Sequence, residues 1–412
     1  MRAKNILIFS REYPPNIIGG TAIVARSSAE GLQKLGHDVT VVSSHIGKDI
    51  KKKIINGIKV IFISSDYIYM NNTTMGSNVL RHHKKIIDIT MGEIGKIPDI
   101  ILLPDLFSFP EAYIIAKKYN VPLVNILLQD FNKMLIYDKN GSHKVTNNVN
   151  GDKFDLLKVE EKALIKSNIN VFISNSLSDS IIDNYKLNGE KCKVIYLGVK
   201  KEEITLNEDF EYNKIRNLIC PINKKLFGAI GRLVPIKGFD YLIRAFKIVN
   251  EYNPDTFLYI MGTGPEEKFL RELVKELDLD KSVKIFYEPD REKVVAYMNI
   301  CDYAVVPSVW ESFCYVAAEF MAMKKPLIVN GVDSLNELIV NDESGLICPV
   351  IEEDKIRRVN VDALAKLMIK FLDHPNEALK LGENAKKRAN KLFTEENYAK
   401  NLNSLILDLT QS

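Results

Sequence analysis

The sequence contains no run of about 18 apolar residues, the length that a helix needs to cross a membrane. Its beginning, MRAKNILIFS, passes from two basic residues directly into a strand-like segment, so it lacks the long apolar core of a signal sequence. Both absences predict a soluble, cytoplasmic protein.

Cysteine is also scarce, and its spacing argues against two kinds of structural site. The chain has five cysteines, an odd number, and no CxxC pair. This pattern supplies neither a disulfide framework nor a zinc site, and it predicts small core residues instead. The cysteines are Cys192, Cys220, Cys301, Cys314 and Cys348.

The loop after the first expected strand lacks the glycine pattern of a nicotinamide enzyme. That pattern is GxGxxG with an acidic residue about 20 positions later. Here the loop is SREYPPNIIGG. The sequence therefore does not support an oxidoreductase.

Net charge is low, at +3, but it is unevenly distributed. Residues 1–200 contain 27 Lys and Arg against 19 Asp and Glu, whereas the remaining residues contain 29 against 34. The basic first half predicts attraction to a phosphorylated substrate or to the inner face of a membrane, and an ordinary lysine-rich surface is the alternative. We interpret the run KDIKKK at 48–53 as a polar turn.

A chain of 412 residues is long enough for two globular domains, and its pattern of elements restarts halfway. Strand-like segments such as NILIFS and DIILLP alternate with amphipathic helices, and KLFGAIGRL begins a second series. Such alternation indicates parallel sheets covered on both faces. We expect an α/β protein of two doubly wound, Rossmann-like domains that face each other across a cleft. They are 1–198 and 224–394, with a linker at 199–223 and a C-terminal helix at about 395–412 packed on the first domain.

Ligands of doubly wound sheets bind beyond the carboxyl ends of the strands, so the loops at those ends are candidate sites. In GAIGRLVPIKGFDYL, Arg232 and Lys237 flank the loop that precedes a helix. Two cations beside the amino end of a helix suit a diphosphate. A surface pair is the alternative.

Two pairs of glycines occupy comparable loops. Gly262 and Gly264 in IMGTGPEE follow a strand and permit close approach of a nucleotide to the backbone. Gly19 and Gly20 immediately precede a helix of the first half, whose amides suit a phosphate. A flexible turn is the alternative for the second pair.

Two glutamates occur in the otherwise apolar stretch PSVWESFCYVAAEFMA. Acids in such surroundings need a partner. If a helix begins near Ser312, Glu319 lies about two turns beyond Glu311 and about 80° around the axis, so both carboxylates face one elongated polar ligand. The alternative is that Glu311 caps the helix and Glu319 is a solvated surface residue.

The second half resembles the C-terminal domain of the retaining glycosyltransferases of family 4, the group 1 type with the GT-B fold. Over roughly 226–350 it contains, in order, GRLVPIKGFDYLIRAF, IMGTGPEEKFLREL, YAVVPSVWESFCYVAAEFMAMKKPLIV and NDESGLICP. In the first half, EYPPNIIGGTAIVARSSAEGLQKLGHDVTVVSS is the best match. The resemblance implies a hexosyltransferase that moves a sugar from a UDP- or GDP-sugar to a glycan, lipid-linked, phosphorylated or small-molecule acceptor, without a metal or other cofactor.

The resemblance also implies roles for particular residues. Glu311 and Glu319 match the two acids of the family's ExxxxxxxE motif, the first expected at the hydroxyls of the donor sugar and the second at the ribose. Arg232 and Lys237 are expected to hold the diphosphate and to stabilise the charge of the leaving group. The segment expected to line the sugar pocket is Phe313, Cys314 and Tyr315.

Two departures from the family bear on specificity and turnover. The chain has ESFC where the family often has EGFG, so Ser312 and Cys314 add bulk beside the donor sugar. None of the six histidines lies after the fourth or fifth strand, where many members have one. Asp105, Gln129 or Asp130 is expected to contact the sugar or the acceptor instead.

Two rival functions fit the same pattern. A sugar-nucleotide epimerase of similar architecture binds the same donors. A glycan-assembly subunit that binds donors without turnover is consistent with the missing histidines. We expect no nucleic-acid partner.

Overall fold

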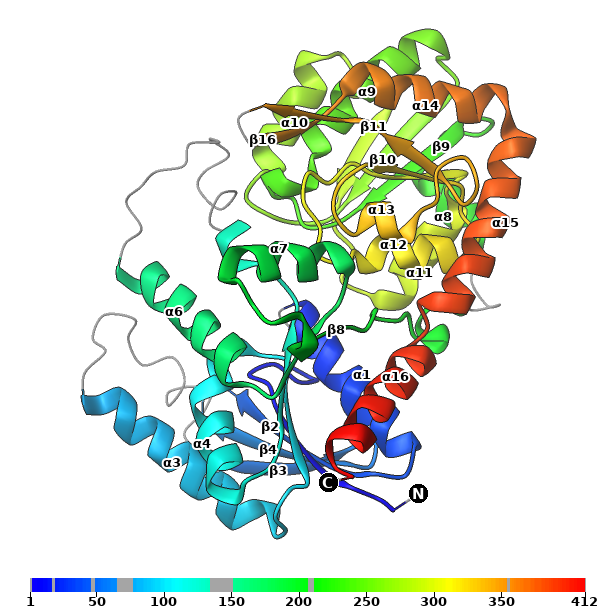
Figure 1. The fold of residues 1–412 in the computed structure, drawn as a ribbon. Helices are drawn as coiled ribbons and strands as arrows, with labels where there is room; N and C mark the ends of the chain where they lie inside the picture. The colour runs from blue at the N-terminus through cyan, green and yellow to red at the C-terminus, as the bar shows by residue number, and fades with distance from the viewer. Residues whose placement is uncertain are drawn as a thin grey trace. The chain divides into compact units, whose positions relative to one another are not determined.

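The computed structural model describes residues 2–16, 19–45, 49–64, 77–133, 151–206, 211–353 and 356–411. The chain forms two compact units (Figure 1). The first runs to Leu197 and includes the segment from Glu395 onward, and the second is Gly198–Thr394. Each unit contains a largely parallel sheet with its own helices, so the predicted fold class of two doubly wound units is confirmed.

The sheet of the first unit has the order β3-β4-β2-β1-β5-β6-β7-β8. Strand β3 pairs antiparallel with β4, and the other neighbours pair in parallel. The strands are β1 (Asn5–Phe9), β2 (Asp38–His45), β3 (Lys51–Ile55), β4 (Ile58–Ser64), β5 (Ile100–Leu103), β6 (Leu123–Leu127), β7 (Ile169–Phe172) and β8 (Cys192–Val194). The helices are α1 (Gly20–Lys34), α3 (Ser77–Ile94), η1 (Leu106–Ser108), α4 (Phe109–Tyr119), α6 (Gly151–Lys166), α7 (Asn175–Tyr185), η2 (Gly189–Lys191) and α16 (Glu395–Leu409).

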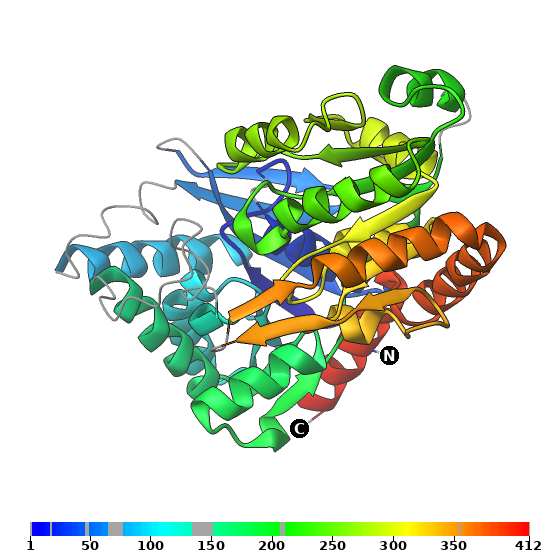
Figure 2. The same cartoon turned by 90° about the horizontal axis from the view of Figure 1, so that it is seen from above.

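The sheet of the second unit is parallel and has the order β11-β10-β9-β12-β13-β14, beside a separate antiparallel hairpin, β15–β16 (Figure 2, orange arrows). The strands are β9 (Lys225–Ile230), β10 (Thr256–Met261), β11 (Val283–Phe286), β12 (Tyr303–Val306), β13 (Leu327–Asn330), β14 (Leu346–Cys348), β15 (Val350–Glu353) and β16 (Ile356–Val359). The helices are η3 (Lys201–Ile204), α8 (Tyr212–Ile219), η4 (Pro235–Lys237), α9 (Phe239–Tyr252), α10 (Glu267–Glu276), α11 (Arg291–Ile300), α12 (Tyr315–Ala322), α13 (Leu335–Leu338), α14 (Val361–Asp373) and α15 (Pro375–Leu392).

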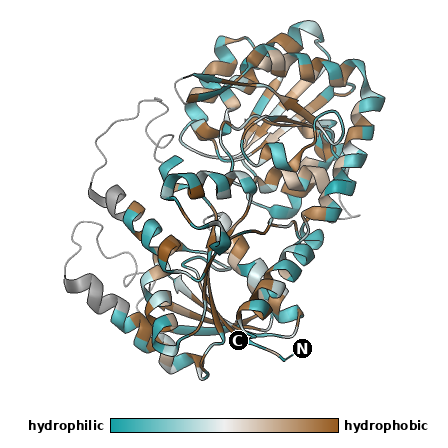
Figure 3. Cartoon of the chain, in the orientation of Figure 1, coloured by the Kyte–Doolittle hydropathy of each residue, from teal (hydrophilic) through white to brown (hydrophobic). Residues whose placement is uncertain are grey.

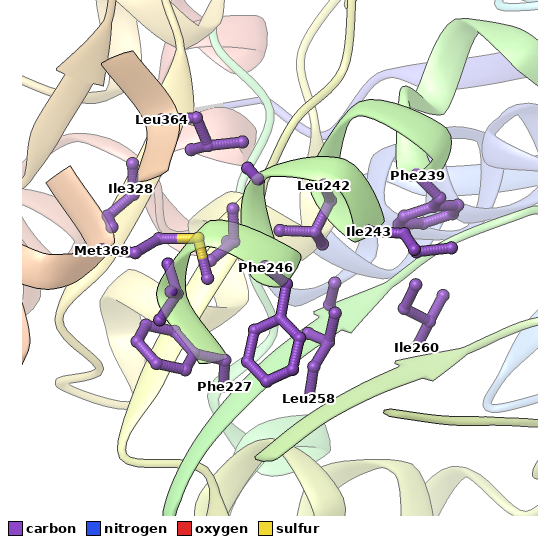
Figure 4. Packing of buried hydrophobic residues seen from close by; sticks show 14 of the residues in the cluster. Phe227, Phe239, Leu242, Ile243, Phe246, Leu258, Ile260, Ile328, Leu364 and Met368 are labelled. Atoms are coloured by element: carbon purple, nitrogen blue, oxygen red, sulfur yellow. The ribbon is translucent and has the colours of Figure 1, made fainter. Parts of the chain in front are cut away.

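The central strands of both sheets are almost continuously apolar, as the hydropathy colouring shows (Figure 3), which is typical of parallel strands covered on both faces by helices. In the second unit, Phe227 of β9 packs edge to face on Phe246 of α9, with ring centroids 6.3 Å apart (Figure 4). Both rings are fully buried. This core fixes the strands whose ends carry the predicted site.

Each sheet has one point at which its strand order reverses. In the first unit this point lies between β1 and β5, and in the second between β9 and β12. Ligands of doubly wound sheets bind beyond the carboxyl ends of the strands at such a reversal. The loops after β9 and β12 are therefore the favoured ligand-binding position of the second unit.

Two local predictions were wrong. The run at 48–53 is not simply a polar turn, because Lys51–Ile55 form edge strand β3, where lysines stay solvated and discourage pairing with another chain. The predicted linker contains helix α8, which packs against α11. Its polar composition reflects a helix with only one covered face.

Helix α16 returns the chain to the first unit and packs along α1. Ser27 donates to the buried carboxylate of Glu395 at 2.6 Å, and the hydroxyls of Ser28 and Tyr398 lie 2.8 Å apart. A Cβ atom on Gly31 would lie only 2.6 Å from that of Ala399, so glycine is required where the two helices touch. Within the described ranges, no helix is both long and apolar enough to cross a membrane.

Candidate functional site

Lys237 and Glu311 meet at the reversal point of the second sheet. Lys237 ends η4 in the loop after β9, and Glu311 lies in the loop after β12. The lysine Nζ donates to Glu311 Oε1 at 2.5 Å, and Ser308 Oγ donates to the same oxygen at 2.8 Å. The two charged side chains are only 20% and 9% exposed. The sequence predicted both residues as site residues, and the structure joins them in one ion pair.

Gly238 allows these two loops to approach each other. It has φ +65°, a left-handed conformation that favours glycine. A Cβ atom at this position would lie 2.3 Å from the carbonyl oxygen of Pro307. Val309 also donates its amide to the carbonyl of Ile236 at 2.9 Å. The backbone therefore fixes Lys237 beside Glu311.

Burial and the ion pair together determine the protonation states of Lys237 and Cys314. Burial, the largest single effect, lowers the pKa of Lys237, but the charge and hydrogen bond of Glu311, together with a contribution from Cys314, outweigh it and the net pKa is raised. Burial and the same carboxylate raise the pKa of the Cys314 thiol. The lysine is thus charged and the thiol neutral across the physiological pH range.

The helix after Glu311 begins later than predicted. Its first residue is Tyr315, and its N-cap is Cys314 at φ +71° and ψ 77°. A residue in this left-handed conformation interrupts the helix, so the expected start near Ser312 is wrong. Glu311 is therefore not a cap of the helix, and the angle of about 80° between the two glutamates does not apply.

Glu319 lies on α12 with its side chain 13% exposed, and it forms an ion pair with Arg291 in the first turn of α11. Burial raises its pKa and the charge of Arg291 lowers it, with a net rise. The alternative of a solvated surface residue is wrong. Sequence analysis missed Arg291, because no motif links the loop after β11 to α12.

Arg232 differs from Lys237 in its surroundings. Its side chain is exposed and has no hydrogen bond or ion pair within the described part of the chain. It lies in the same loop after β9 as Lys237, and its charge lowers the pKa of that lysine. Lys237 is engaged by Glu311, while Arg232 is open to an anionic ligand.

In the segment predicted to line the sugar pocket, the side chain of Phe313 lies in the core. The ring of Phe313 is buried and packs on Tyr315 and Phe393, with centroids 5.3 and 6.0 Å apart. Its side chain therefore belongs to the core. Contact between a sugar and the backbone of this segment stays a prediction.

The chain itself explains two of the four predicted site glycines. A Cβ atom on Gly262 would lie 1.8 Å from the carbonyl oxygen of Gly231, and one on Gly264 would lie 2.3 Å from that of Leu233. Glycine is therefore required where the loops after β9 and β10 pack together. Approach of a nucleotide to this pair stays a prediction.

The other two glycines lie in the first unit. Gly19 is the N-cap of α1, Gly20 is its first residue, and a Cβ atom on either would have no atom within 4 Å. Gly19 donates its amide to Glu12 Oε2 at 2.8 Å. Sequence analysis missed this carboxylate, which accepts from one of the amides expected to face a phosphate.

Asp105 and Asp130 have internal partners. Asp105 accepts from Arg11 Nε at 2.9 Å, at the reversal point of the first sheet, and is 3% exposed. Asp130 is fully buried and accepts from Ser180 Oγ at 2.6 Å. Both carboxylates thus stabilise loops, and among the three residues predicted to contact the sugar only Gln129 is half-buried rather than buried.

A buried acid that sequence analysis missed lies next to the segment that contains Asp130. Glu160 of α6 is 1% exposed and accepts from the Tyr185 hydroxyl at 2.5 Å, and Asn132 donates to that hydroxyl at 3.1 Å. Burial, with a contribution from Asp130, raises the pKa of Glu160 to about 7. The carboxyl is therefore neutral in the folded protein over a pH range in which it ionises in the unfolded chain.

We expect Glu160 to make stability depend on pH. Because its pKa rises from 4.5 to about 7 on folding, the stabilisation is complete below pH 4.5 and is lost as the pH rises through 7. The loss amounts to about 3 kcal/mol. Glu160→Gln should abolish it, which denaturant unfolding between pH 5 and 8 will measure.

The neighbouring exposed residue provides the control, because Glu161→Gln removes the same charge from the same helix. It should leave the pH dependence of the wild type unchanged. Equal pH profiles for both variants would contradict the assignment to Glu160.

Among the described residues, no group of three His, Cys, Asp or Glu side chains is arranged to hold a metal ion.

Two family models of known proteins together match most of the chain. Residues 213–388 match the family model for glycosyl transferases group 1, and residues 18–203 match that for Glycosyltransferase Family 4. An uncharacterized glycosyltransferase of Methanocaldococcus jannaschii is 28% identical over 345 residues, 83% of this chain and 84% of that protein.

Two solved structures have the same fold. Sucrose-phosphate synthase of Thermosynechococcus elongatus superposes with a TM-score of 0.78 at 20% identity, over 98% of this chain and 99% of that one. Anabaena HepE in complex with UDP-glucose superposes with a TM-score of 0.74 at 17% identity, over 98% and 100% of the two chains.

Proposed function

Because the chain belongs to the group 1 glycosyltransferases of family 4, enzymes that use nucleotide sugars, we propose that it transfers a hexose with retention of the anomeric configuration. The donor is a nucleoside diphosphate sugar, and the acceptor is a hydroxyl of a glycan, a lipid-linked sugar or a small phosphorylated molecule. The observation that carries this proposal is the Lys237–Glu311 pair beside Arg232 at the reversal point of the second sheet.

Each of these groups has its own role in the proposed reaction. The bond between the anomeric carbon and the diphosphate oxygen breaks, and the departing oxygen takes the electron pair. The acceptor hydroxyl oxygen forms the new bond to the anomeric carbon, and its proton passes to the departing diphosphate. Lys237, which is held by Glu311 in a partly buried site, stabilises the negative charge of the departing diphosphate without rearrangement during the reaction, and the exposed Arg232 adds a second positive charge beside it. Glu311 accepts hydrogen bonds from the donor sugar, and Glu319 from the ribose.

One structural neighbour supports the choice of the donor to be tested first. HepE was solved with UDP-glucose, and its fold matches that of this chain. The basic first 200 residues favour an acceptor that carries phosphate. We therefore propose to test UDP-hexoses as donors before other nucleotide sugars.

A nucleotide screen tests the proposal directly. UDP, GDP and ADP are added separately, and the melting temperature is followed for the wild type and for Glu311→Gln. Ligand at 100 times its dissociation constant stabilises a protein by about 2.7 kcal/mol. The best nucleotide is then supplied as its hexose conjugate, and release of the diphosphate is measured. A wild type that neither binds a nucleotide nor cleaves a sugar conjugate would refute the proposal.

We expect chelation to leave activity nearly intact. Arg232 and Lys237 supply two positive charges at the place expected for the diphosphate, and these replace the charge that a divalent cation contributes elsewhere. Initial rates with and without EDTA should agree within about twofold, a difference of under 0.5 kcal/mol in activation free energy. Loss of activity on chelation and recovery with Mn²⁺ would contradict this prediction.

A further inference from the structure

The backbone of Glu311 is held by two consecutive residues after β13. Asp333 Oδ2 accepts from the Glu311 amide at 3.4 Å, a long bond, and Ser334 Oγ donates to the Glu311 carbonyl at 3.1 Å. Asp333 has φ +40°, in the left-handed region that aspartate tolerates better than most residues. Both polar groups of the Glu311 backbone thus depend on this turn.

Asp333 is itself a buried charge. Its side chain is 4% exposed, and its other oxygen accepts from Arg357 Nη1 at 2.7 Å. A buried carboxylate that loses its cation is strongly disfavoured and moves toward water. The position of Asp333, and with it the Glu311 turn, therefore depends on Arg357.

Arg357 comes from the β15–β16 hairpin, which lies outside the main sheet. It is directly opposite Glu352 across the two strands, and its Nε donates to Glu352 Oε2 at 3.0 Å. Two residues along the same face, Val359 is buried and lies 3.5 Å from the position of a Cβ atom on Gly238. The hairpin therefore lies against the loop that carries Lys237 and reaches the loop that carries Glu311 through Asp333.

From this geometry we propose that Arg357 is a positioning residue for the donor sugar: through Asp333 it fixes the loop that presents Glu311 to the sugar and to Lys237. The inference rests on the proposed glycosyltransferase function. Arg357 touches neither the donor nor the reacting atoms. It acts on the orientation of Glu311, so its loss should slow turnover more than it weakens binding of the nucleotide.

The chain offers a matched control on the same strand. Arg358 lies opposite Ile351, on the other face of the hairpin, and its ion pair among the described residues is a long one, 3.5 Å from the exposed carboxylate of Glu353. Arg357→Met and Arg358→Met remove the same charge and leave side chains of similar length. They differ in the link to Asp333.

Hydrogen–deuterium exchange tests the positioning without any assumption about activity. In Arg357→Met, amides of the loop 308–314 should exchange about tenfold faster than in the wild type, because a local opening costs less when Asp333 has lost its partner. In Arg358→Met and in the conservative Arg357→Lys they should exchange at the wild-type rate. Unchanged exchange in Arg357→Met would overturn the inference whether or not the protein is a glycosyltransferase.

Donor kinetics test the consequence for catalysis. Arg357→Met should lower kcat for cleavage of the preferred UDP-hexose about tenfold, with the Kd for UDP within twofold of wild type, because displacement of a catalytic group by about 1 Å can cost up to 100-fold in rate. In the Glu311→Gln background the same substitution should cause no further loss. An equal loss in both backgrounds would overturn the inference. Absence of cleavage by the wild type would instead refute the proposed function.

Discussion

Glu311→Gln should lower kcat for cleavage of the donor about ten- to a hundredfold while the Kd for the nucleoside diphosphate stays within about twofold of wild type. A hydrogen bond to a charged group is worth about 1.5 to 3 kcal/mol, and this bond strengthens as the anomeric carbon gains positive charge. Glutamine keeps the size of the side chain and its bond to Ser308. The measurement is donor kinetics combined with calorimetric titration of the nucleoside diphosphate.

Glu319→Gln is the contrast for this experiment. If Glu319 holds the ribose, it contributes equally to the bound donor and to the transition state, so its replacement should raise KM for the donor about tenfold and leave kcat unchanged. The loss of charge also frees Arg291 on α11. Normal kinetics in Glu311→Gln would remove Glu311 from the donor site, and equal effects on kcat in both variants would contradict the division of roles.

Lys237→Met should have the largest effect on kcat/KM, a loss of about a hundredfold or more. The substitution removes one of the two cations expected at the diphosphate, and a single electrostatic contact of this kind contributes about 2.7 to 4 kcal/mol to the transition state. It also leaves the Glu311 carboxylate, which is 9% exposed, without its cation. We therefore expect the free energy of unfolding to fall by about 3 kcal/mol in the same variant.

The double variant Lys237→Met, Glu311→Gln separates these two effects. Replacing both partners removes the uncompensated charge, so most of the lost stability should return while activity does not. Lys247→Met, on the more open pair of Lys247 with Glu251 on α9, is the control and should cost about 0.5 kcal/mol or less. A double variant no more stable than Lys237→Met would show that the two charges are not coupled.

The elements that were predicted best are those whose own residues determine them. Strand segments such as NILIFS contain an unbroken apolar run, and helix α9 has a clear amphipathic period, so local pattern was sufficient to indicate two doubly wound units. Strand β3 was missed because its lysines reflect an edge position, which depends on the order of the strands in the sheet. The late start of α12 was missed because Cys314 adopts a conformation usually filled by glycine.

The site residues show the same distinction. Lys237 and Glu311 follow the ends of strands β9 and β12, and the reversal of strand order brings those ends together, so their location could be predicted from sequence. The long-range partners of the site residues could not be predicted in this way. The pairs Arg291–Glu319 and Arg357–Asp333 join segments separated by more than twenty residues, and no local period or motif encodes such contacts.

The return of the chain through α16 has a consequence for biosynthesis. Helix α1 cannot bury the face around Gly31 until Ala399 and its neighbours have left the ribosome, after the whole second unit has been made. The second unit is continuous in sequence from Gly198 to Thr394 and so can complete its core first, although it is translated later. The first unit waits with an exposed apolar helix face for the time needed to synthesise about 200 residues, roughly 10 to 40 s at 5 to 20 residues per second. Chaperones that bind apolar segments are therefore expected to act on the unit that is made first.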